Sequence, residues 1–167
     1  PDNPRRALHR APRLIKANIG YGADLTVLEH LGIGDFNGDG RNDLVATPYG
    51  NGAKIWVFLQ TPAGVINKAA NYNRNTLDIP VSLDGVDLDT DGRDDLLLGH
   101  SGWGAIGYHL QKGGSLLGEV VVGLSGFAGW QVDGTITGTG VATGDLNSDG
   151  CTDVAVAARY NGLQVFR

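Results

Sequence analysis

The sequence predicts an all-β fold made of β-propeller blades, each with four antiparallel strands, and it contains three such repeats. The first observation is a nine-residue stretch rich in Asp, Asn and Gly that starts at residues 35, 87 and 145. The second is that each copy lies between two short apolar segments that carry no helix start signal. The third is the spacing of 52 and 58 residues between the copies. A four-stranded unit that repeats at this interval is typical of propeller blades.

The chain begins with a predicted basic arm at residues 1–12, which carries Arg5, Arg6, His9 and Arg10. Such an arm is either a solvated terminus or an electrostatic docking site. Residues 13–19 form a predicted strand that resembles the starts of the fourth strands in the repeats. We therefore expect it to be the missing outer strand, supplied to the third blade or to a neighbouring copy. Because the chain starts at Pro1 and has no Met, we expect a processed product, a fragment or a trimmed subunit.

The expected strand order is the same in each repeat: one strand enters the Asp-rich loop, one leaves it, and two complete the blade. The predicted blades span about residues 25–78, 79–123 and 136–167. The strands expected to enter the loops are residues 30–36, 82–88 and 140–146, and those expected to leave them are 43–47, 95–98 and 153–158. The expected third strands are residues 54–59, 105–110 and 163–166, and the fourth strands begin at Val65 and Leu116. Residues 54–59 are apolar on both faces, which predicts a strand between two neighbouring sheets.

The three Asp-rich loops are predicted to bind one Ca²⁺ ion each. Every copy has side-chain oxygens at positions 1, 3, 5 and 9 and glycine at position 6, and position 7 offers its carbonyl oxygen. With this spacing alternate residues point towards an oxygen-seeking cation, and glycine permits the sharp turn. A lone copy could be a hairpin turn without metal, but three copies with the same residue types favour calcium. The predicted metal-binding residues are Asp35, Asn37, Asp39, Arg41 and Asp43, then Asp87, Asp89, Asp91, Arg93 and Asp95, then Asp145, Asn147, Asp149, Cys151 and Asp153.

The loops differ from those of EF-hands, which have a bidentate Glu at position 12 and lie between two helices. Position 12 is Ala46, Leu98 and Val156 in the three copies, inside predicted strands. The metal is therefore expected in the connection between two strands.

The net charge of −5 is explained by the loops, because ten of the 18 acidic residues occupy predicted ligand positions. Three bound Ca²⁺ ions would change the net charge from −5 to +1, so the acidity indicates no basic partner. We expect no nucleic-acid surface, and no segment is long enough to span a membrane. The single cysteine, Cys151, excludes an internal disulfide and is not expected to be a catalytic thiol. Loops of modest charge bind calcium at roughly millimolar concentrations, which favours an extracellular, periplasmic or cell-surface location.

The segment from Gly34 to Val45 and its two copies resemble the FG-GAP/VCBS-type repeats of integrin α-subunit propellers and of many extracellular proteins, some of them lectins. The resemblance extends from about Leu14 to Phe166. It implies calcium in the hairpin between the first two strands of each blade, bound by the Asp and Asn residues at positions 1, 3, 5 and 9. Propellers of this family usually have seven blades, and three blades cannot close a ring. We therefore expect either a homo-oligomer, in which a second copy gives six blades, or further chain that completes the ring.

No catalytic constellation is visible in the sequence, so we do not expect an enzyme. Two tryptophans favour a binding module: Trp103 occupies a predicted hairpin tip, and Trp130 lies in a glycine-rich stretch. Exposed aromatic residues on a rigid scaffold stack on sugars or contact proteins, although both side chains could instead pack against a neighbouring blade or subunit. The expected function is a calcium-stabilised, lectin-like recognition or adhesion propeller that binds a glycan or a protein ligand. The alternatives are a structural subunit of a surface assembly and the propeller part of a polysaccharide-degrading enzyme.

Overall fold

The computed structural model describes residues 28–48, 53–67, 69–77, 80–100, 105–123, 140–158 and 162–167. In these ranges the chain forms strands, turns and bends, and no helix has the length and apolar character needed to cross a membrane. The predicted arm at residues 1–12, the predicted strand at residues 13–19, and Trp103 and Trp130 all lie outside the described residues.

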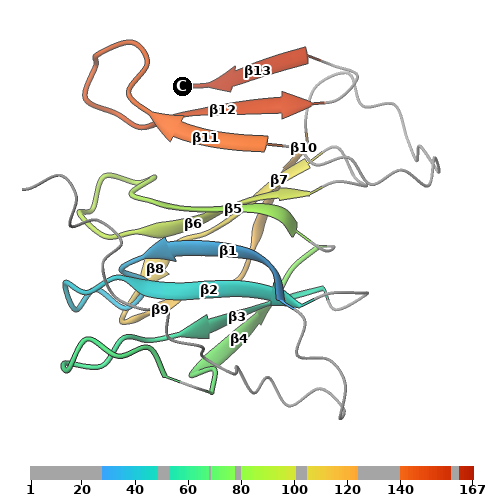
Figure 1. Ribbon diagram of the computed structural model, residues 1–167. Coiled ribbons are helices and arrows are strands. Elements are labelled where there is room, and N and C mark those ends of the chain that lie inside the picture. Colours follow the sequence, from blue (N-terminus) through green and yellow to red (C-terminus); the bar gives the residue numbers. More distant parts are fainter. Residues whose placement is uncertain are drawn as a thin grey trace, which may run out of the picture.

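The all-β prediction is confirmed, because the strands form three antiparallel sheets stacked one above another (Figure 1). Each sheet lies within one predicted blade, and together they resemble successive blades of an incomplete ring. The first sheet contains, in order, β1 (Leu28–Gly34), β2 (Asp43–Pro48), β3 (Lys54–Phe58) and β4 (Tyr72–Asn75). The second contains β5 (Pro80–Val86), β6 (Asp95–His100), β7 (Ala105–His109) and β10 (Val120–Gly123). The third contains β11 (Gly140–Gly144), β12 (Asp153–Ala158) and β13 (Gly162–Phe166), and a separate hairpin consists of β8 (Gln111–Lys112) and β9 (Ser115–Leu116).

The strand that enters each Asp-rich loop is an edge strand, and these edge strands contact one another: β5 lies against both β1 and β11. Glycine permits the close approach between β1 and β5. A Cβ atom at Gly85 would overlap the backbone oxygen of Ile33, and one at Gly32 would lie 3.0 Å from the Cβ of Leu83. The two strands can therefore approach this closely only because these positions lack side chains.

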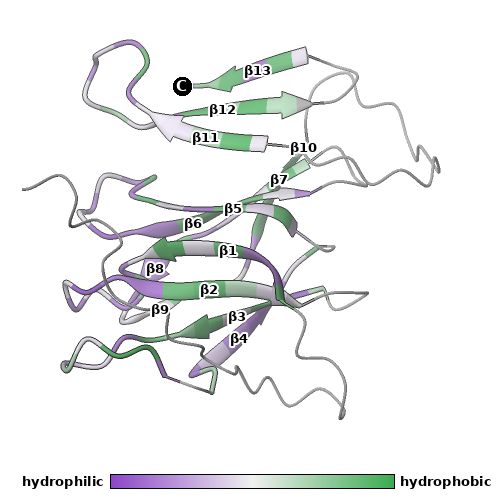
Figure 2. Cartoon of the chain, viewed as in Figure 1, coloured by the Kyte–Doolittle hydropathy of each residue, from purple (hydrophilic) through white to green (hydrophobic). Residues whose placement is uncertain are grey.

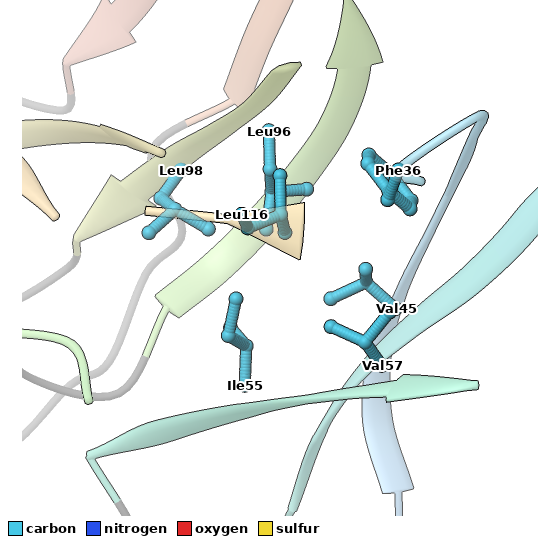
Figure 3. Packing of buried hydrophobic residues seen from close by; sticks show 7 residues of the cluster. All are labelled: Phe36, Val45, Ile55, Val57, Leu96, Leu98 and Leu116. Atoms are coloured by element: carbon cyan, nitrogen blue, oxygen red, sulfur yellow. The ribbon is translucent and has the colours of Figure 1, made fainter. Parts of the chain in front are cut away.

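The first and second sheets enclose a buried apolar cluster (Figure 3). Its members are Phe36, Val45, Ile55 and Val57 from the first sheet and its loop, and Leu96, Leu98 and Leu116 from the second blade. Leu116 reaches this interface from the β8–β9 hairpin, where its backbone N–H donates to the hydroxyl of Tyr72 at 3.1 Å. Arg74 Nε donates to the carbonyl oxygen of Leu116 at 2.5 Å. Apolar burial and these polar contacts together join the first two blades.

The second and third sheets are joined by another cluster, which consists of Leu97, Ile106, Val154 and Val156. The hydroxyl of Thr143 also donates to Asp84 across this interface at 2.8 Å. Here the sheets leave a cavity of about 340 Å³, whose walls include Leu88, Tyr108, Val122 and Phe166. The second and third sheets are therefore not in full contact at the place where this cavity lies.

The predicted starts of the fourth strands are wrong in both blades. In the first blade the fourth strand begins at Tyr72. Ile66, directly after Val65, instead forms an isolated antiparallel bridge with Gln60. In the second blade Leu116 belongs to the β8–β9 hairpin, and the fourth strand begins at Val120. A short hairpin thus follows the third strand in each case. The apolar residue of this hairpin, Ile66 or Leu116, packs on the face of a sheet. An apolar residue shortly after the third strand therefore does not indicate the start of the fourth.

The prediction that residues 54–59 lie between two sheets holds for only one face of β3. Ile55 and Val57 pack against the second sheet. Phe58, on the other face, packs with Ala46, Leu28 and Ile66 of its own blade within the described residues. It is the second sheet that has a sheet on either side. In its strand β6 all residues are buried, with Leu96 and Leu98 facing the first sheet and Leu97 facing the third.

Candidate metal centre

Each Asp-rich loop connects the first two strands of its sheet, and the three loops lie on the same side of the molecule (Figure 1). The pairs Gly34–Asp43, Val86–Asp95 and Gly144–Asp153 close the hairpins. Each loop is therefore held at both ends by a strand ladder, so its ligand positions depend on the sheet as well as on local sequence.

The carboxylate at position 1 organises the backbone of each loop. Asp35 accepts hydrogen bonds from the backbone N–H groups of Gly38, Asp39 and Gly40 at 2.8, 3.0 and 2.6 Å. The N–H groups of positions 5 and 6 donate in the same way to Asp87 at 3.1 and 2.9 Å, and to Asp145 at 3.1 and 2.9 Å. A side-chain oxygen that accepts nearby N–H groups fixes a tight turn, which explains why Asp stands here in all three copies.

Two positions in each loop have a left-handed backbone. The glycine at position 6 was expected from the sequence, and its φ is +79° in Gly40, +82° in Gly92 and +87° in Gly150. Position 4 was missed by sequence reasoning, yet its φ is also positive: +74° in Gly38, +60° in Thr90 and +63° in Ser148. The sequence signal for a left-handed backbone at position 4 was Gly38, because glycine adopts this conformation without strain. Thr90 and Ser148 adopt it at a cost that the surrounding loop must offset.

The carboxylate at position 9 ties the loop to the rest of the blade. Asp43, Asp95 and Asp153 are each about 1% exposed or less. Their Oδ2 atoms accept the backbone N–H of position 2 at 3.1, 3.0 and 2.9 Å. The Oδ1 atoms of Asp43 and Asp95 also accept the N–H groups of Gln60 and Gln111, at 2.8 and 2.7 Å. Oδ1 of Asp153 is buried and has no hydrogen-bond partner within the described ranges.

The loops concentrate negative charge at buried positions. Burial raises the pKa of Asp43 to about 6, and the charges of Asp39 and Asp35 contribute to the same rise. Burial also raises the pKa of Asp95, with a further contribution from Asp89 and Asp91. Both shifts mean that ionising these carboxyl groups is less favourable than in water, and a positive charge close by would favour the ionised forms. A bound cation would supply that charge.

In the second loop three carboxylates converge. Asp87, Asp89 and Asp95 each present an oxygen, and these oxygens lie within 4.8 Å of one another. Two oxygens bound to one Ca²⁺ at about 2.3–2.6 Å can be no more than roughly 5 Å apart, so the spacing fits a single ion. This acidic cluster could therefore hold a metal ion, and its oxygen ligands suit a hard cation such as Ca²⁺.

The first and third loops have Asn at position 3 in place of the third carboxylate. Oδ1 of Asn37 accepts the N–H of Asp39 at 2.8 Å, and Oδ1 of Asn147 accepts the N–H of Asp149 at 3.0 Å. The amide oxygens therefore turn into their loops as the predicted ligand pattern requires. Because these oxygens are uncharged, each of the two loops carries one negative charge fewer at positions 1, 3, 5 and 9 than the second loop.

The carboxylate at position 5 interacts with the residue at position 7. The backbone N–H of Arg41, Arg93 and Cys151 donates to Asp39, Asp91 and Asp149 at 3.1, 3.1 and 2.8 Å. The guanidinium of Arg41 contacts Asp39, and Nη1 of Arg93 lies 3.6 Å from Asp91. Cys151 provides no positive charge, and the negative charge of Asp149 raises the pKa of its thiol, which disfavours the thiolate.

Sequence reasoning missed a contact that Asp94 makes with the neighbouring blade. This residue is position 8 of the second loop, yet its Oδ2 accepts the backbone N–H of Asp35, the first residue of the neighbouring loop, at 2.7 Å. This hydrogen bond joins two Asp-rich loops across the interface between blades. The sequence carries no signal for it, because the two residues are 59 positions apart.

Two known protein families match most of the repeat region. Residues 35–98, which contain the first two loops, match the FG-GAP-like repeat. Residues 137–165, which contain the third loop, match the FG-GAP repeat. A search of curated proteins found no match to the chain.

Proposed function

The chain belongs to the FG-GAP-type repeat family, and from this premise we propose that it is a recognition or adhesion propeller stabilised by three Ca²⁺ ions. Repeats of this family suggest a propeller-like recognition or adhesion domain. The finer proposal is that calcium holds the loops in shape and that the assembled blades bind a glycan or a protein ligand. FG-GAP repeats usually occur in extracellular domains, which supports an extracellular or cell-surface location where calcium is abundant.

The observation that carries the calcium proposal is the convergence of Asp87, Asp89 and Asp95 in a loop whose backbone geometry occurs three times. The same hydrogen bonds at positions 1 and 9, and the same positive φ at positions 4 and 6, occur in the other two loops. The side chains at positions 1, 3, 5 and 9 and the carbonyl at position 7 would hold the ion. When bound, the ion would supply a positive charge that favours the ionised forms of buried Asp43 and Asp95.

The second loop should bind Ca²⁺ most tightly. It has four carboxylates at the proposed ligand positions, because Asp89 stands where the other loops have Asn37 and Asn147. Ligand charge is one of the properties that set the affinity of calcium loops. Lys112 reduces this advantage only slightly. Its Nζ lies 3.5 Å from Asp89 Oδ2, but the Lys112 side chain is more than half exposed, so the ion pair is weak.

Thermal unfolding with a chelator and with millimolar Ca²⁺ tests the metal proposal. A ligand that binds only the folded state at about ten to a hundred times its Kd stabilises it by roughly 1–3 kcal/mol per site. We therefore expect a clear rise in the midpoint with Ca²⁺. Mg²⁺ at the same concentration is the control, because it demands a stricter octahedral geometry and should stabilise less. An unchanged midpoint with Ca²⁺ would contradict the assignment.

The ligand proposal is tested with the calcium-loaded protein on a glycan array and in pull-downs of extracellular proteins. We propose Trp103 and Trp130 as the contact residues from their positions in the sequence. Specific glycan binding that depends on Ca²⁺ and on Trp103 would support the lectin-like function. A calcium-loaded, folded protein that captures neither a glycan nor a protein would count against recognition while leaving the metal sites intact.

A further inference from the structure

The backbone of Asp35 is held by a side chain of the neighbouring blade. The pair Gly34–Asp43 is the last of the ladder between β1 and β2, so the N–H of Asp35 lies beyond the strand hydrogen bonds. This N–H donates instead to Oδ2 of Asp94 in the second loop at 2.7 Å. The carboxylate of Asp35 accepts three backbone N–H groups of its own loop and is the first of the proposed calcium ligands. Asp94 therefore holds the residue that organises the whole first loop.

Gly34 provides the room for the Asp94 side chain. A Cβ atom at Gly34 would lie 3.1 Å from both the Cβ and the Oδ2 of Asp94, whereas carbon atoms in contact are normally about 3.5–4.0 Å apart. At the interface between the second and third blades the corresponding residues are Val86, before position 1, and Thr152, at position 8. The combination of a glycine in one loop and a carboxylate opposite it is therefore particular to the first two loops.

The second blade also lies against the middle of the first loop. A Cβ atom at Gly38, which is position 4, would lie 3.1 Å from Nε2 of Gln111 and 3.5 Å from Cδ of Arg93. Gln111 belongs to β8, and its backbone N–H donates to Asp95 of the second loop at 2.7 Å. In Figure 2 the loops between β1 and β2 and between β5 and β6 are hydrophilic segments on the same side of the molecule. The first loop is thus supported by residues that also form or hold the second.

We propose that Asp94 is a positioning residue of the first calcium centre, so that the calcium affinity of the first loop depends on a residue of the second. This inference rests on the calcium sites proposed above. Asp94 does not bind the ion. It holds the backbone of Asp35, so that the Asp35 carboxylate stays turned into its loop. A charged acceptor makes a stronger hydrogen bond than a neutral one, and removal of a partner that orients a metal ligand typically lowers metal affinity by about 10–100-fold.

Nuclear magnetic resonance can follow the three loops separately in the full chain. The glycine at position 6 of each loop donates its N–H to the Asp at position 1, so Gly40, Gly92 and Gly150 report one loop each. In a Ca²⁺ titration of the Asp94→Ala chain, the Kd reported by Gly40 should rise about tenfold. The values reported by Gly92 and Gly150 should stay within about twofold, because no proposed ligand of those loops is changed. An unchanged Kd at Gly40, or an equal rise at Gly92, would overturn the proposal.

Asp94→Asn separates the hydrogen bond from the charge. The amide keeps an acceptor oxygen for the N–H of Asp35, so the Kd reported by Gly40 should stay within about threefold of that of the unsubstituted chain. If Asp94→Asn weakens the first loop as much as Asp94→Ala does, charge and not positioning controls the affinity, and the proposal is wrong.

Asn42→Ala is the matched control, because Asn42 is position 8 of the first loop and is exposed. It should leave the Kd of every loop within about twofold. A rise at Gly40 as large as that in Asp94→Ala would refute a specific role for Asp94.

The same titrations distinguish failure of this inference from failure of the calcium proposal. If none of the three glycine signals responds to Ca²⁺, both fail. If all three respond and the Kd at Gly40 is insensitive to Asp94, only the positioning role fails.

Hydrogen exchange of the Asp35 amide tests the contact in the unsubstituted chain, which covers the case in which Asp94→Ala does not fold. With a chelator present, this amide should exchange at least about tenfold more slowly than in an unfolded chain, because Asp94 already accepts its hydrogen bond. Exchange at the rate of an unfolded chain would overturn the proposal.

Discussion

Replacing Gly85 by Ala should strongly destabilise the contact between the first two blades. The new Cβ would overlap the backbone oxygen of Ile33, and it would lie 2.9 Å from the carbonyl carbon of Ile33 and 3.1 Å from the Cα of Gly34. Carbon atoms in contact are normally about 3.5–4.0 Å apart. The distance from the Cβ to the oxygen would be only 2.2 Å, so strands β1 and β5 would have to separate by roughly 1 Å or more, because backbone atoms cannot rotate away as a side chain can.

Overpacking of this kind costs typically about 1–3 kcal/mol, and a clash with backbone belongs at the upper end. For a chain of this size about 3 kcal/mol lowers the midpoint of thermal unfolding by roughly 6–12 °C. The assay is a melting curve in millimolar Ca²⁺. Gly144→Ala is the matched control, because Gly144 lies in the equivalent edge strand β11 and a Cβ there meets no atom within 4 Å. Its effect should stay within about 1 kcal/mol and can be stabilising. Equal shifts in the two variants would refute the close packing of β1 on β5.

Three further predictions concern charge, pH and the ligand. Asn37→Asp should raise the calcium affinity of the first loop, and Asp89→Asn should lower that of the second, each by roughly tenfold; titration calorimetry that shows no change would contradict control by ligand charge. Burial lowers the pKa of His109 below its ordinary value of 6.5, so the unfolded chain takes up a proton first as the pH falls. The stability contributed by neutral His109 is then present in full above pH 6.5 and is lost as the pH falls from there through the lower pKa of the folded protein. His109→Asn, which can still donate to the Leu117 carbonyl, should flatten the unfolding free energy below pH 6.5; an unaltered profile would exclude His109 as its source. Trp103→Ala should change stability by less than about 1 kcal/mol but reduce ligand binding, and a loss of 3–5 kcal/mol, typical of a buried Trp, would contradict a recognition role.

The repeats and their loops were predictable because the information for them is local. Glycine at position 6, Asp at position 1 and the flanking apolar segments act within about ten residues of one another, through turn geometry and strand propensity. The strands on either side of each loop lie within about two residues of the expected positions. Position 4 was less visible, because Thr90 and Ser148 adopt a backbone that their residue types rarely favour. The loop hydrogen bonds, and not the residue itself, impose that conformation.

The connections between the third and fourth strands were not predictable in the same way. Ile66 and Leu116 are apolar residues that follow a turn, which is also what the start of a strand looks like. Whether such a residue continues its own sheet or packs on a face depends on what lies opposite. Leu116 packs on a face because its backbone is hydrogen-bonded by Tyr72 and Arg74, which are more than 40 residues earlier in the chain.

The sequence alone determined that the chain is a series of β blades with an oxygen-rich loop in the first hairpin of each. The reason is that loop spacing and strand patterning are encoded over short distances. Only the tertiary structure decided which apolar strand lies between two sheets, that Gly85 admits the backbone of Ile33, and that Asp94 holds the loop of the neighbouring blade. These features depend on contacts between blades. Hydrophobic patterning indicates that a face will be buried, but it does not indicate which surface will cover that face.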